Sequence, residues 1–285
     1  MKNSLKAVLA VVLAITGFLT YSLFTSAASE KDKEVIKESL FDSRLDKIID
    51  QGYIRVGTPG DYKPFTYLNP ETKQYEGYDI EAAKSLAKEL GVEVKFVATT
   101  WPTLMDDLLA DKFDIAMGGI TRNMGRQMKA QFSHGYIPFG KSPLIRAEDK
   151  DKFTSLEAIN QPDVTIGVNP GGTNQKFVDA NITKAKVIVV QNNLDIPGKV
   201  ASGEVDVMIT DSIEAIHYAR ENDVLYAALS ENPWEPSQFG YLMQQGDQQF
   251  LNTVNFWMEE MELKGVFEEL RNEFGINPDS EEVEE

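Results

Sequence analysis

Apolar and polar positions along this chain follow two spacings, one typical of strands and one typical of helices. Short apolar runs at residues 54–57, 92–97 and 114–118 predict strands, whereas residues 79–90 and 102–110 carry apolar side chains at helical spacing. Strands that alternate with helices in this order are typical of parallel α/β construction.

A second series of the same kind begins near Pro143. Its predicted elements are strands at residues 164–168, 187–190 and 205–209 and helices at residues 173–180, 197–202 and 212–221. Two successive α/β series predict two lobes. Residues 248–263 then predict a long helix with one apolar stripe, which we interpret as core packing. The stripe consists of Phe250, Leu251, Val254, Trp257, Met258 and Met261.

The first residues of the chain have the pattern of a secretory signal. Two lysines precede an apolar run at residues 7–19, and small residues lead up to Ala28. We expect residues 1–28 to be a signal peptide that is cleaved after Ala28, with an uncleaved anchor as the alternative. Residues 29–42 are expected to be a charged linker, and residues 277–285 an acidic tail without a fixed structure.

Composition narrows the possible chemistry. The 285 residues are 42% hydrophobic and 10% aromatic, which suits a folded protein of one or two domains. The chain has no cysteine and two histidines, so it can form neither a disulfide nor a thiolate or three-histidine metal site. Its formal net charge of −17 argues against nucleic acid or an anionic membrane surface as a partner.

The residues that follow the predicted strands are the first candidates for a site, because ligands of open α/β sheets bind beyond the carboxyl ends of strands. The loop after the first strand contains Asp61, Tyr62 and Phe65, a carboxylate and two aromatic side chains that can wall a pocket. The loop after the third strand contains Asn123 as a helix N-cap and Arg126 in the first turn, where a guanidinium can bind a carboxylate. Each loop also fits a plain turn or cap.

Two further loops carry polar groups. Residues 169–174 follow a strand and open a helix, so free backbone amides and the Thr173 hydroxyl predict an anion site or, alternatively, a plain turn. Asp211 and Glu214 lie three residues apart at the next strand end. They form either a capping box or two close carboxylates, of which one has a raised pKa and stays protonated.

These segments resemble the extracytoplasmic amino-acid-binding proteins of ABC transporters, over about residues 43–275. The resemblance lies in residues 61–65, 77–80, 123–126 and 210–211 and in Trp101. It implies a type II periplasmic-binding-protein fold, with two α/β lobes joined by two hinge strands and a ligand cleft between them. We expect lobe 1 to comprise residues 43–141 and 237–276, and lobe 2 residues 142–236.

Within that superfamily the sequence is similar to the cyclohexadienyl dehydratases, exported enzymes that convert prephenate to phenylpyruvate and arogenate to phenylalanine. The similar stretches are residues 60–65, 101–102, 113–117, 140–143, 169–177 and 210–215, of which 169–174 are the most specific. The resemblance implies a small-molecule substrate and a periplasmic location. It implies no cofactor, because formation of an aromatic ring drives the loss of water and carbon dioxide.

The resemblance also implies residue roles. Glu214 matches a general acid that protonates the departing hydroxyl, Lys141 a cleft lysine, and Asn169 a polar substrate contact. Arg126 and Thr173 match the carboxylate-binding pair of the superfamily. The full set of expected substrate-binding residues is Asp61, Tyr62, Phe65, Trp101, Thr121, Asn123, Arg126, Gly172, Thr173, Asn174 and Asp211.

Two departures from the family pattern and one competing function accompany these expectations. Gln175 replaces an acidic residue, a change expected to matter little, and His134-Gly135 replaces an apolar residue and proline. The competing function is a receptor that binds an amino acid and docks on an ABC permease, because the same fold serves both purposes. The chemistry of Glu214, Lys141 and Asn169 favours the enzyme.

Overall fold

The structure of this protein is a computed structural model that describes residues 43–276. The expected signal peptide at residues 1–28, the linker at residues 29–42 and the acidic tail at residues 277–285 lie outside the described residues. Within the described part, α3 (Arg44–Gln51) precedes the first strand.

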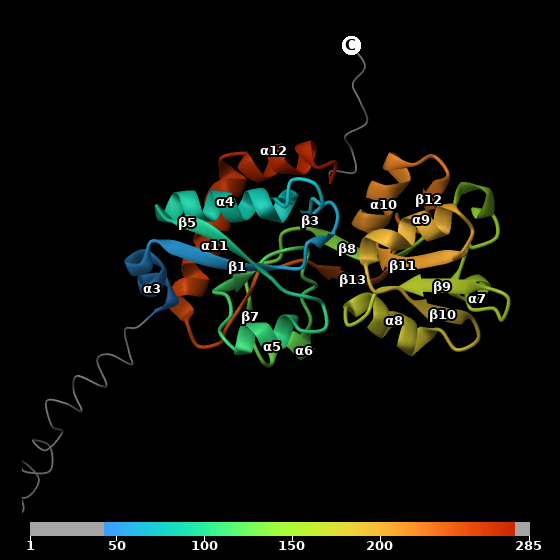
Figure 1. Ribbon diagram of the computed structural model, residues 1–285, viewed down its shortest axis with the longest axis horizontal. Coiled ribbons are helices and arrows are strands. Elements are labelled where there is room, and N and C mark those ends of the chain that lie inside the picture. The colour runs from blue at the N-terminus through green and yellow to red at the C-terminus, as the bar shows by residue number, and fades with distance from the viewer. Residues whose placement is uncertain (1–42, 277–285) are drawn as a thin grey trace, which may run out of the picture. The chain divides into compact units, whose positions relative to one another are not determined.

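The first sheet has five strands in the order β5-β1-β6-β14-β7. Strand β1 pairs in parallel with β5 and with the central strand β6, whereas β14 pairs antiparallel with β6 and β7. Its strands are β1 (Tyr53–Thr58), β5 (Glu93–Ala98), β6 (Ile115–Ala116), β7 (Gln131–Phe132) and β14 (Leu242–Met243). The helices α4 (Tyr78–Leu90) and α12 (Val266–Glu273) lie on one side of this sheet, and α5 (Leu104–Leu109) and α6 (Met124–Gln127) on the other (Figure 1).

The second sheet has six strands in the order β10-β9-β11-β8-β12, with β13 also paired to β8. Its strands are β8 (Pro138–Arg146), β9 (Thr165–Val168), β10 (Lys186–Val189), β11 (Val207–Asp211), β12 (Leu225–Ala227) and β13 (Trp234–Gln238). The helices in this part are α7 (Leu156–Ile159), α8 (Thr173–Asn181), α9 (Ile196–Ala201) and α10 (Ser212–Glu221), with short 3-10 turns η1 (Ala147–Asp149) and η2 (Asn193–Asp195). In Figure 1, α9 and α10 lie on the opposite side of this sheet from α7 and α8.

The chain passes between the two sheets at two places. It leaves the first sheet after β7 and enters the second through β8, and it returns after β13 to form β14. Because β8 and β13 are paired antiparallel, the two crossings lie side by side. This arrangement sets the carboxyl ends of β1 and β6 opposite those of β9 and β11, where the polar loops were predicted.

A third, small sheet is formed by β2 (Asp61–Tyr62), β3 (Thr66–Leu68) and β4 (Tyr75–Glu76). The sequence did not predict these strands, because two- and three-residue strands are too short to show an alternating pattern. They shape the loop after β1, so Asp61 and Tyr62 are held on a paired strand rather than on a plain turn.

Most predicted helices and strands are confirmed within one or two residues, and two strands differ for a physical reason. The strand predicted at 205–209 is β11 (Val207–Asp211), because Thr210 and Asp211 pair with Ser142 and Lys141 of β8 although they are polar. The strand predicted at 114–118 is shorter, since Gly118 and Gly119 turn the backbone to φ 149° and 67° after β6.

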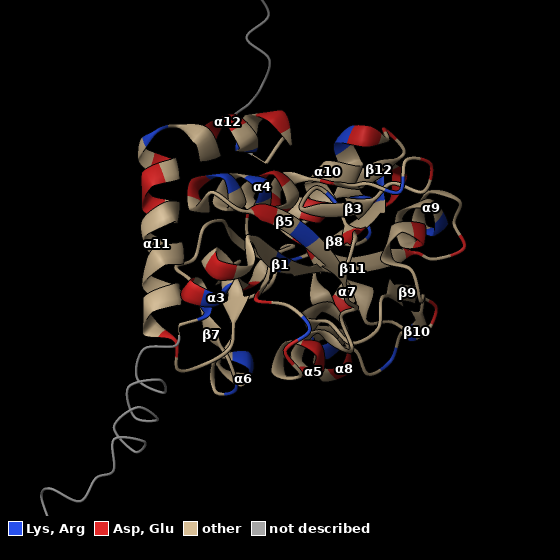
Figure 2. Ribbon diagram, turned by 60° about the vertical axis from the view of Figure 1, so that its left-hand side comes forward, with Lys and Arg blue, Asp and Glu red and all other residues tan. Residues whose placement is uncertain are grey.

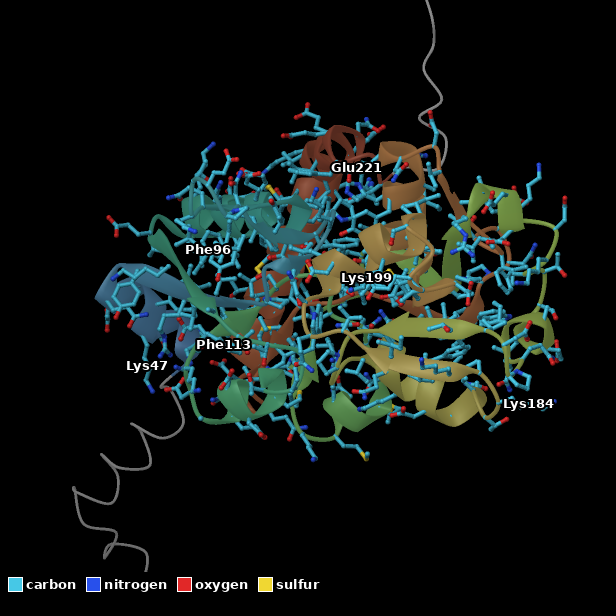
Figure 3. The ribbon with its side chains drawn as sticks, turned by 45° about the vertical axis from the view of Figure 1, so that its right-hand side comes forward. Lys47, Phe96, Phe113, Lys184, Lys199 and Glu221 are labelled. Carbon is cyan, nitrogen blue, oxygen red and sulfur yellow. The ribbon has the colours of Figure 1, made fainter. Side chains whose placement is uncertain are left out.

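The long helix α11 (Gln248–Leu263) confirms the prediction of core packing. Phe250, Val254, Trp257, Met258 and Met261 of its stripe are buried, whereas Leu251 is only partly buried. A second core cluster centres on Phe113, labelled in Figure 3, whose ring leaves no room for a side chain at Gly57. Within residues 43–276 no helix combines the length and apolar character of a membrane span.

Acidic residues are spread over the outer helices rather than gathered in the core. Figure 2 shows them on α12 and near the end of α11, for example. The excess of negative charge is therefore largely a property of the solvated surface, and a ligand site for an anion needs its own local cations.

Candidate functional site

The site lies where the loops after β1, β6, β9 and β11 meet. The residues that line its central cavity are Tyr62, Trp101, Gly119, Thr121, Asn169, Gly172, Thr173, Asn174 and Asp211. The space left in this cavity is about 10 Å³. Pockets that hold drug-sized ligands typically measure roughly 300–1,000 Å³, so the two lobes are closed on each other here.

Direct contacts between the lobes close this cavity. Tyr62 from the first lobe donates its hydroxyl to Asp211 Oδ2 of the second at 2.5 Å. The hydroxyls of Thr121 and Thr173 lie 3.1 Å apart across the same gap. A ligand that enters between the lobes has to replace these contacts with its own polar groups.

An aromatic wall stands behind Asp61. The indole Nε1 of Trp101 donates to Asp61 Oδ1 at 2.9 Å, and the Trp101 and Tyr62 rings meet edge to face at 5.5 Å. Burial raises the pKa of Asp61 from 3.8 to about 6, against the lowering effect of the Trp101 hydrogen bond. The Asp61 carboxyl therefore changes charge in mildly acidic solution.

Phe65 does not contact the cavity, which corrects the expectation of a direct substrate contact. Its side chain is fully buried and packs among Tyr78, Ile137, Phe139 and other core residues. It stacks on Tyr62 with ring centroids 5.7 Å apart. Phe65 therefore supports the wall from behind, because a large apolar side chain gains more from the core than from a polar cleft.

Lys141 and Asp211 form a buried ion pair at the centre of the site. Antiparallel pairing of β8 with β11 sets the two residues opposite each other, and Lys141 Nζ lies 2.5 Å from Asp211 Oδ1. The same ammonium donates to Thr173 Oγ1 at 2.9 Å and to Asn174 Oδ1 at 2.5 Å. The pair thus connects the sheet of the second lobe to the first turn of α8.

The loop before α8 presents the groups predicted for an anion site. Gly172 is the N-cap of α8, so the first amides of this helix lack partners within the helix. Gln175 has a role that the sequence did not predict, because its Oε1 accepts a hydrogen bond from the Gly171 amide at 2.6 Å and so holds the loop. Asn169 lines the cavity, and within residues 43–276 its side-chain amide has no hydrogen-bond partner.

Arg126 is a buried cation next to this site. Asn123 caps its helix as predicted, accepting from the Arg126 amide at 3.0 Å. The guanidinium is 8% exposed and donates through Nη1 to the Thr121 carbonyl at 2.9 Å. Among the described residues it has no carboxylate within ion-pair distance. Burial lowers the pKa of Arg126 from 12.5 to about 10, and the negative charge of Asp211 opposes this effect.

Glu214 lies in the first turn of α10, fully buried and behind Asp211 rather than on the cavity wall. Its Oε2 bonds the Thr210 hydroxyl, and its Oε1 accepts from Asn193 Nδ2 at 2.6 Å. Burial raises the pKa of Glu214 well above 4.5, and nearby Asp211 raises it further, whereas the Thr210 and Asn193 hydrogen bonds lower it. These surroundings favour the protonated, neutral form of the Glu214 carboxyl.

A neighbouring groove of about 360 Å³ extends the site outward. Lys141 and Asn123 line it together with Arg122 and Lys176. Most of the expected residues thus lie in the central cavity, in this groove or in the buried layer that contains Glu214 and Arg126. Asp61 lines an adjoining pocket together with Trp101 and Asn169. Within residues 43–276, no three histidine, aspartate or glutamate side chains are grouped as metal ligands.

Two residues of the site were missed in the sequence. Asn193 follows β10 as the other candidates follow their strands, so the same rule applied to this strand would have found it. Asp79 anchors the cavity loop, because its Oδ2 accepts from the Gly119 amide at 2.6 Å and from the Tyr136 hydroxyl at 2.7 Å. Nothing in the local sequence indicates that Asp79 reaches Gly119, since the contact joins a helix to a distant turn.

Comparison with known proteins shows homology to an enzyme and to a binding protein. Cyclohexadienyl dehydratase of Pseudomonas aeruginosa is 42% identical over 225 residues, which cover 79% of this chain and 83% of that protein. An ancestral amino-acid-binding protein, described as a precursor of cyclohexadienyl dehydratase, superposes with a TM-score of 0.76 at 38% identity, covering 81% of this chain and 99% of its own.

An ancestral cyclohexadienyl dehydratase is 57% identical and superposes with a TM-score of 0.52, covering 82% of this chain and 96% of its own. The predicted two-lobed type II fold is confirmed by these structural relatives. The family model of bacterial extracellular solute-binding proteins, family 3, matches residues 54–277. Because that match spans both lobes, the chain belongs to family 3 of the bacterial extracellular solute-binding proteins.

Proposed function

We propose that this protein is an exported cyclohexadienyl dehydratase that converts prephenate to phenylpyruvate, arogenate to phenylalanine, or both. In this proposal Glu214 is the general acid, Lys141 and Asn169 contact the substrate, and residues 1–28 are a cleaved signal that directs the protein to the periplasm. The 42% identity to a cyclohexadienyl dehydratase supports the assignment.

The observation that carries the proposal is the burial of Glu214 next to Asp211. A receptor for a carboxylate ligand gains no affinity from a fully buried carboxyl beside the ion pair of its cleft. A lyase that expels a hydroxyl needs a protonated carboxyl, and the burial of Glu214, which favours its protonated form, supports this role.

The proposed reaction breaks two bonds that join the cyclohexadiene ring to its substituents, the carboxylate and the hydroxyl. The electron pair of the bond to the ring carboxylate moves into the ring as carbon dioxide leaves, and the C–O bond breaks on the opposite side. Glu214 donates its proton to the departing hydroxyl, which leaves as water. Glu214 is then reprotonated from solvent, so each turnover of the prephenate dianion consumes one proton.

The remaining groups anchor the substrate. The guanidinium of Arg126 and the free amides at the start of α8 suit one carboxylate, and the Asn169 amide faces the cavity without a protein partner. Substrate in the cleft separates Tyr62 from Asp211, which bond directly in the closed structure. That separation opens a path from the cavity toward Glu214.

The first test is turnover. Purified protein lacking residues 1–28 is incubated with prephenate and with arogenate at pH 8, and phenylpyruvate and phenylalanine are measured separately. We expect product at a rate proportional to enzyme concentration for at least one substrate. Absence of product from both substrates would contradict the proposal.

A second function is favoured by one comparison. The ancestral structure at 38% identity is described as an amino-acid-binding protein, and Asp61 together with Arg126 offers partners for the ammonium and carboxylate of an amino acid. Calorimetry with a panel of amino acids tests this receptor function. Tight binding without turnover of prephenate or arogenate would establish the receptor in place of the enzyme.

A further inference from the structure

Asn193 joins the buried glutamate to the opposite lobe. It is fully buried at the start of η2 in the second lobe. Its Nδ2 donates both hydrogens, one to Glu214 Oε1 at 2.6 Å and one to the backbone carbonyl of Asp61 at 3.0 Å. Asp61 belongs to β2 of the first lobe, so this amide group makes its full set of donated bonds only when the lobes are closed.

The Asp61 carbonyl determines which way the Asn193 amide faces. A carbonyl oxygen can only accept a hydrogen bond, so Nδ2 rather than Oδ1 must face it. The same nitrogen then faces Glu214 Oε1, where a proton on the carboxyl would collide with the donated N–H. The proton of a neutral Glu214 is therefore confined to Oε2, next to the Thr210 hydroxyl.

This arrangement leaves Asn193 with an unsatisfied atom. Its Oδ1 is buried and has no hydrogen-bond partner in the described part of the chain. A buried acceptor without a partner is costly, so an asparagine that served packing alone would be expected to bond both ends of its amide. The retained contacts are those to Glu214 and Asp61.

We propose that Asn193 is a positioning residue that orients Glu214 for proton donation when the lobes close. The proposal rests on the proposed dehydratase function. In the open form the Asp61 carbonyl is withdrawn and the Asn193 amide loses the partner that fixes its orientation. Closure around substrate restores that orientation and presents the protonated oxygen of Glu214 on a defined side.

Other charged and titratable groups face Glu214 from several elements. Asp211 on β11 and Asp61 on β2 act on it electrostatically, as do the hydroxyls of Tyr62 on β2 and Tyr218 on α10. These groups are unchanged by a substitution at Asn193. A shift in the titration of Glu214 on replacing Asn193 therefore reports the lost hydrogen bond.

The test compares Asn193→Leu with Asn192→Ala. Asn192 is exposed and caps the same 3-10 turn through the Leu194 amide, but it makes no contact with Glu214. We expect Asn193→Leu to lower kcat roughly 10- to 100-fold with little change in KM, because a misplaced catalytic group costs rate rather than binding. Losing a donor to the carboxylate also raises the pKa of Glu214, so the alkaline fall in kcat moves to higher pH.

The titration of Glu214 is also measured directly, by nuclear magnetic resonance. Carbon-13 carboxyl resonances of glutamate are followed from pH 4 to 10, and the Glu214 signal is assigned by its loss in Glu214→Gln. Its midpoint should move upward in Asn193→Leu and not in Asn192→Ala. Asn193→Ala, which removes the amide without adding a charge, serves if the leucine variant does not fold, and the same upward shift is expected.

The outcomes separate the two proposals. Wild-type protein without turnover contradicts the dehydratase function, while the titration still decides the role of Asn193. Wild-type turnover with an unchanged pH profile, kcat and Glu214 titration in Asn193→Leu overturns the positioning role alone. If Asn193→Leu loses thermal stability while its kcat, pH profile and Glu214 titration are unchanged, Asn193 serves packing alone.

Discussion

At the scale of single residues, burial gives Glu214 the property that its chemistry requires. In water a glutamate releases its proton near pH 4.5, and removal of water shifts this release upward because the charged form loses its solvation. Burial also disfavours the charged form of Arg126, and because this form is a cation, the pKa of Arg126 is lowered. A buried guanidinium without a protein carboxylate is the complement of an anionic ligand.

The pKa of Glu214 leads to a prediction about both activity and stability. Glu214→Gln should reduce kcat by about 100- to 10,000-fold, the usual contribution of general acid catalysis. Because the folded pKa is raised, the unfolded chain releases this proton more readily, and wild-type stability falls as pH rises above 4.5. The neutral glutamine avoids that loss, so the variant should melt at a higher temperature than wild type at pH 8.

The difference in melting temperature should vanish near pH 4, where Glu214 is protonated in both the folded and unfolded states. Thermal unfolding at the two pH values measures it. Glu268→Gln, which removes an exposed carboxylate on α12, is the control and should show no such pH-dependent gain. Equal melting temperatures for wild type and Glu214→Gln at pH 8 would mean that Glu214 is ionised in the folded protein.

At the scale of secondary structure elements, strand register assembles the polar centre. Antiparallel pairing of β11 with β8 sets Asp211 opposite Lys141 and Thr210 opposite Ser142. A shift of one residue would turn each side chain to the other face of the sheet and separate the ion pair. The apolar residues Val207 and Ile209, which pack in the core, oppose such a shift.

The buried ion pair predicts a non-additive pair of substitutions. Lys141→Met leaves Asp211 buried without its cation and should lower the free energy of unfolding by roughly 3–5 kcal/mol. Adding Asp211→Asn removes the unpaired charge, so the double variant should recover much of that stability. Urea unfolding measures both values. A double variant no more stable than Lys141→Met would show that the unpaired charge of Asp211 is not the cause of the loss.

At the scale of the whole described fold, the distance between the lobes governs the site. The contacts that cross the gap include Arg220 Nη1 to the Gly275 carbonyl at 2.6 Å and Lys63 with Glu221 at 3.7 Å, the latter at the end of α10 in Figure 3. Both lie away from the central cavity. The lobes therefore meet on two separate surfaces, of which one contains the central cavity.

Gly171 offers a test of closure. Its φ is +82°, and a side-chain carbon there would lie 2.6 Å from the backbone nitrogen of Pro102 on the other lobe. Gly171→Ala should therefore obstruct the closed form and raise KM by about tenfold or more, an effect of ~1.4 kcal/mol on binding. Steady-state kinetics and calorimetry with an unreactive substrate analogue measure it.

Gly91→Ala is the matched control, because Gly91 has φ +69° and nothing within 4 Å of the added carbon. Both variants share the backbone strain, which costs about 1 kcal/mol of stability. Only the cleft variant should lose affinity. Unchanged KM and affinity in Gly171→Ala would show that substrate is bound without closure at the Pro102 contact.

The sequence alone indicated the alternation of strands and helices, and the search beyond strand ends found Asp61, Tyr62, Asn169, Thr173 and Asp211, which all meet at the site. These features are local, because apolar spacing and turn residues act over a few positions. Short strands such as β2 were missed for the same reason, since two residues carry no periodicity.

Only the tertiary structure decided what each polar residue contacts. In the folded protein Phe65 lies in the core, and Asn193 Nδ2 donates both to Glu214 Oε1 and to the Asp61 carbonyl. The Asp79 carboxylate accepts from the Gly119 amide, 40 residues away in the sequence. Protonation depends on burial, and burial depends on how the two lobes pack. The spacing of apolar residues along the sequence thus determined which polar residues follow the strands. The exclusion of solvent between the packed lobes decided which of them suits a proton donor, a substrate contact or a packing role.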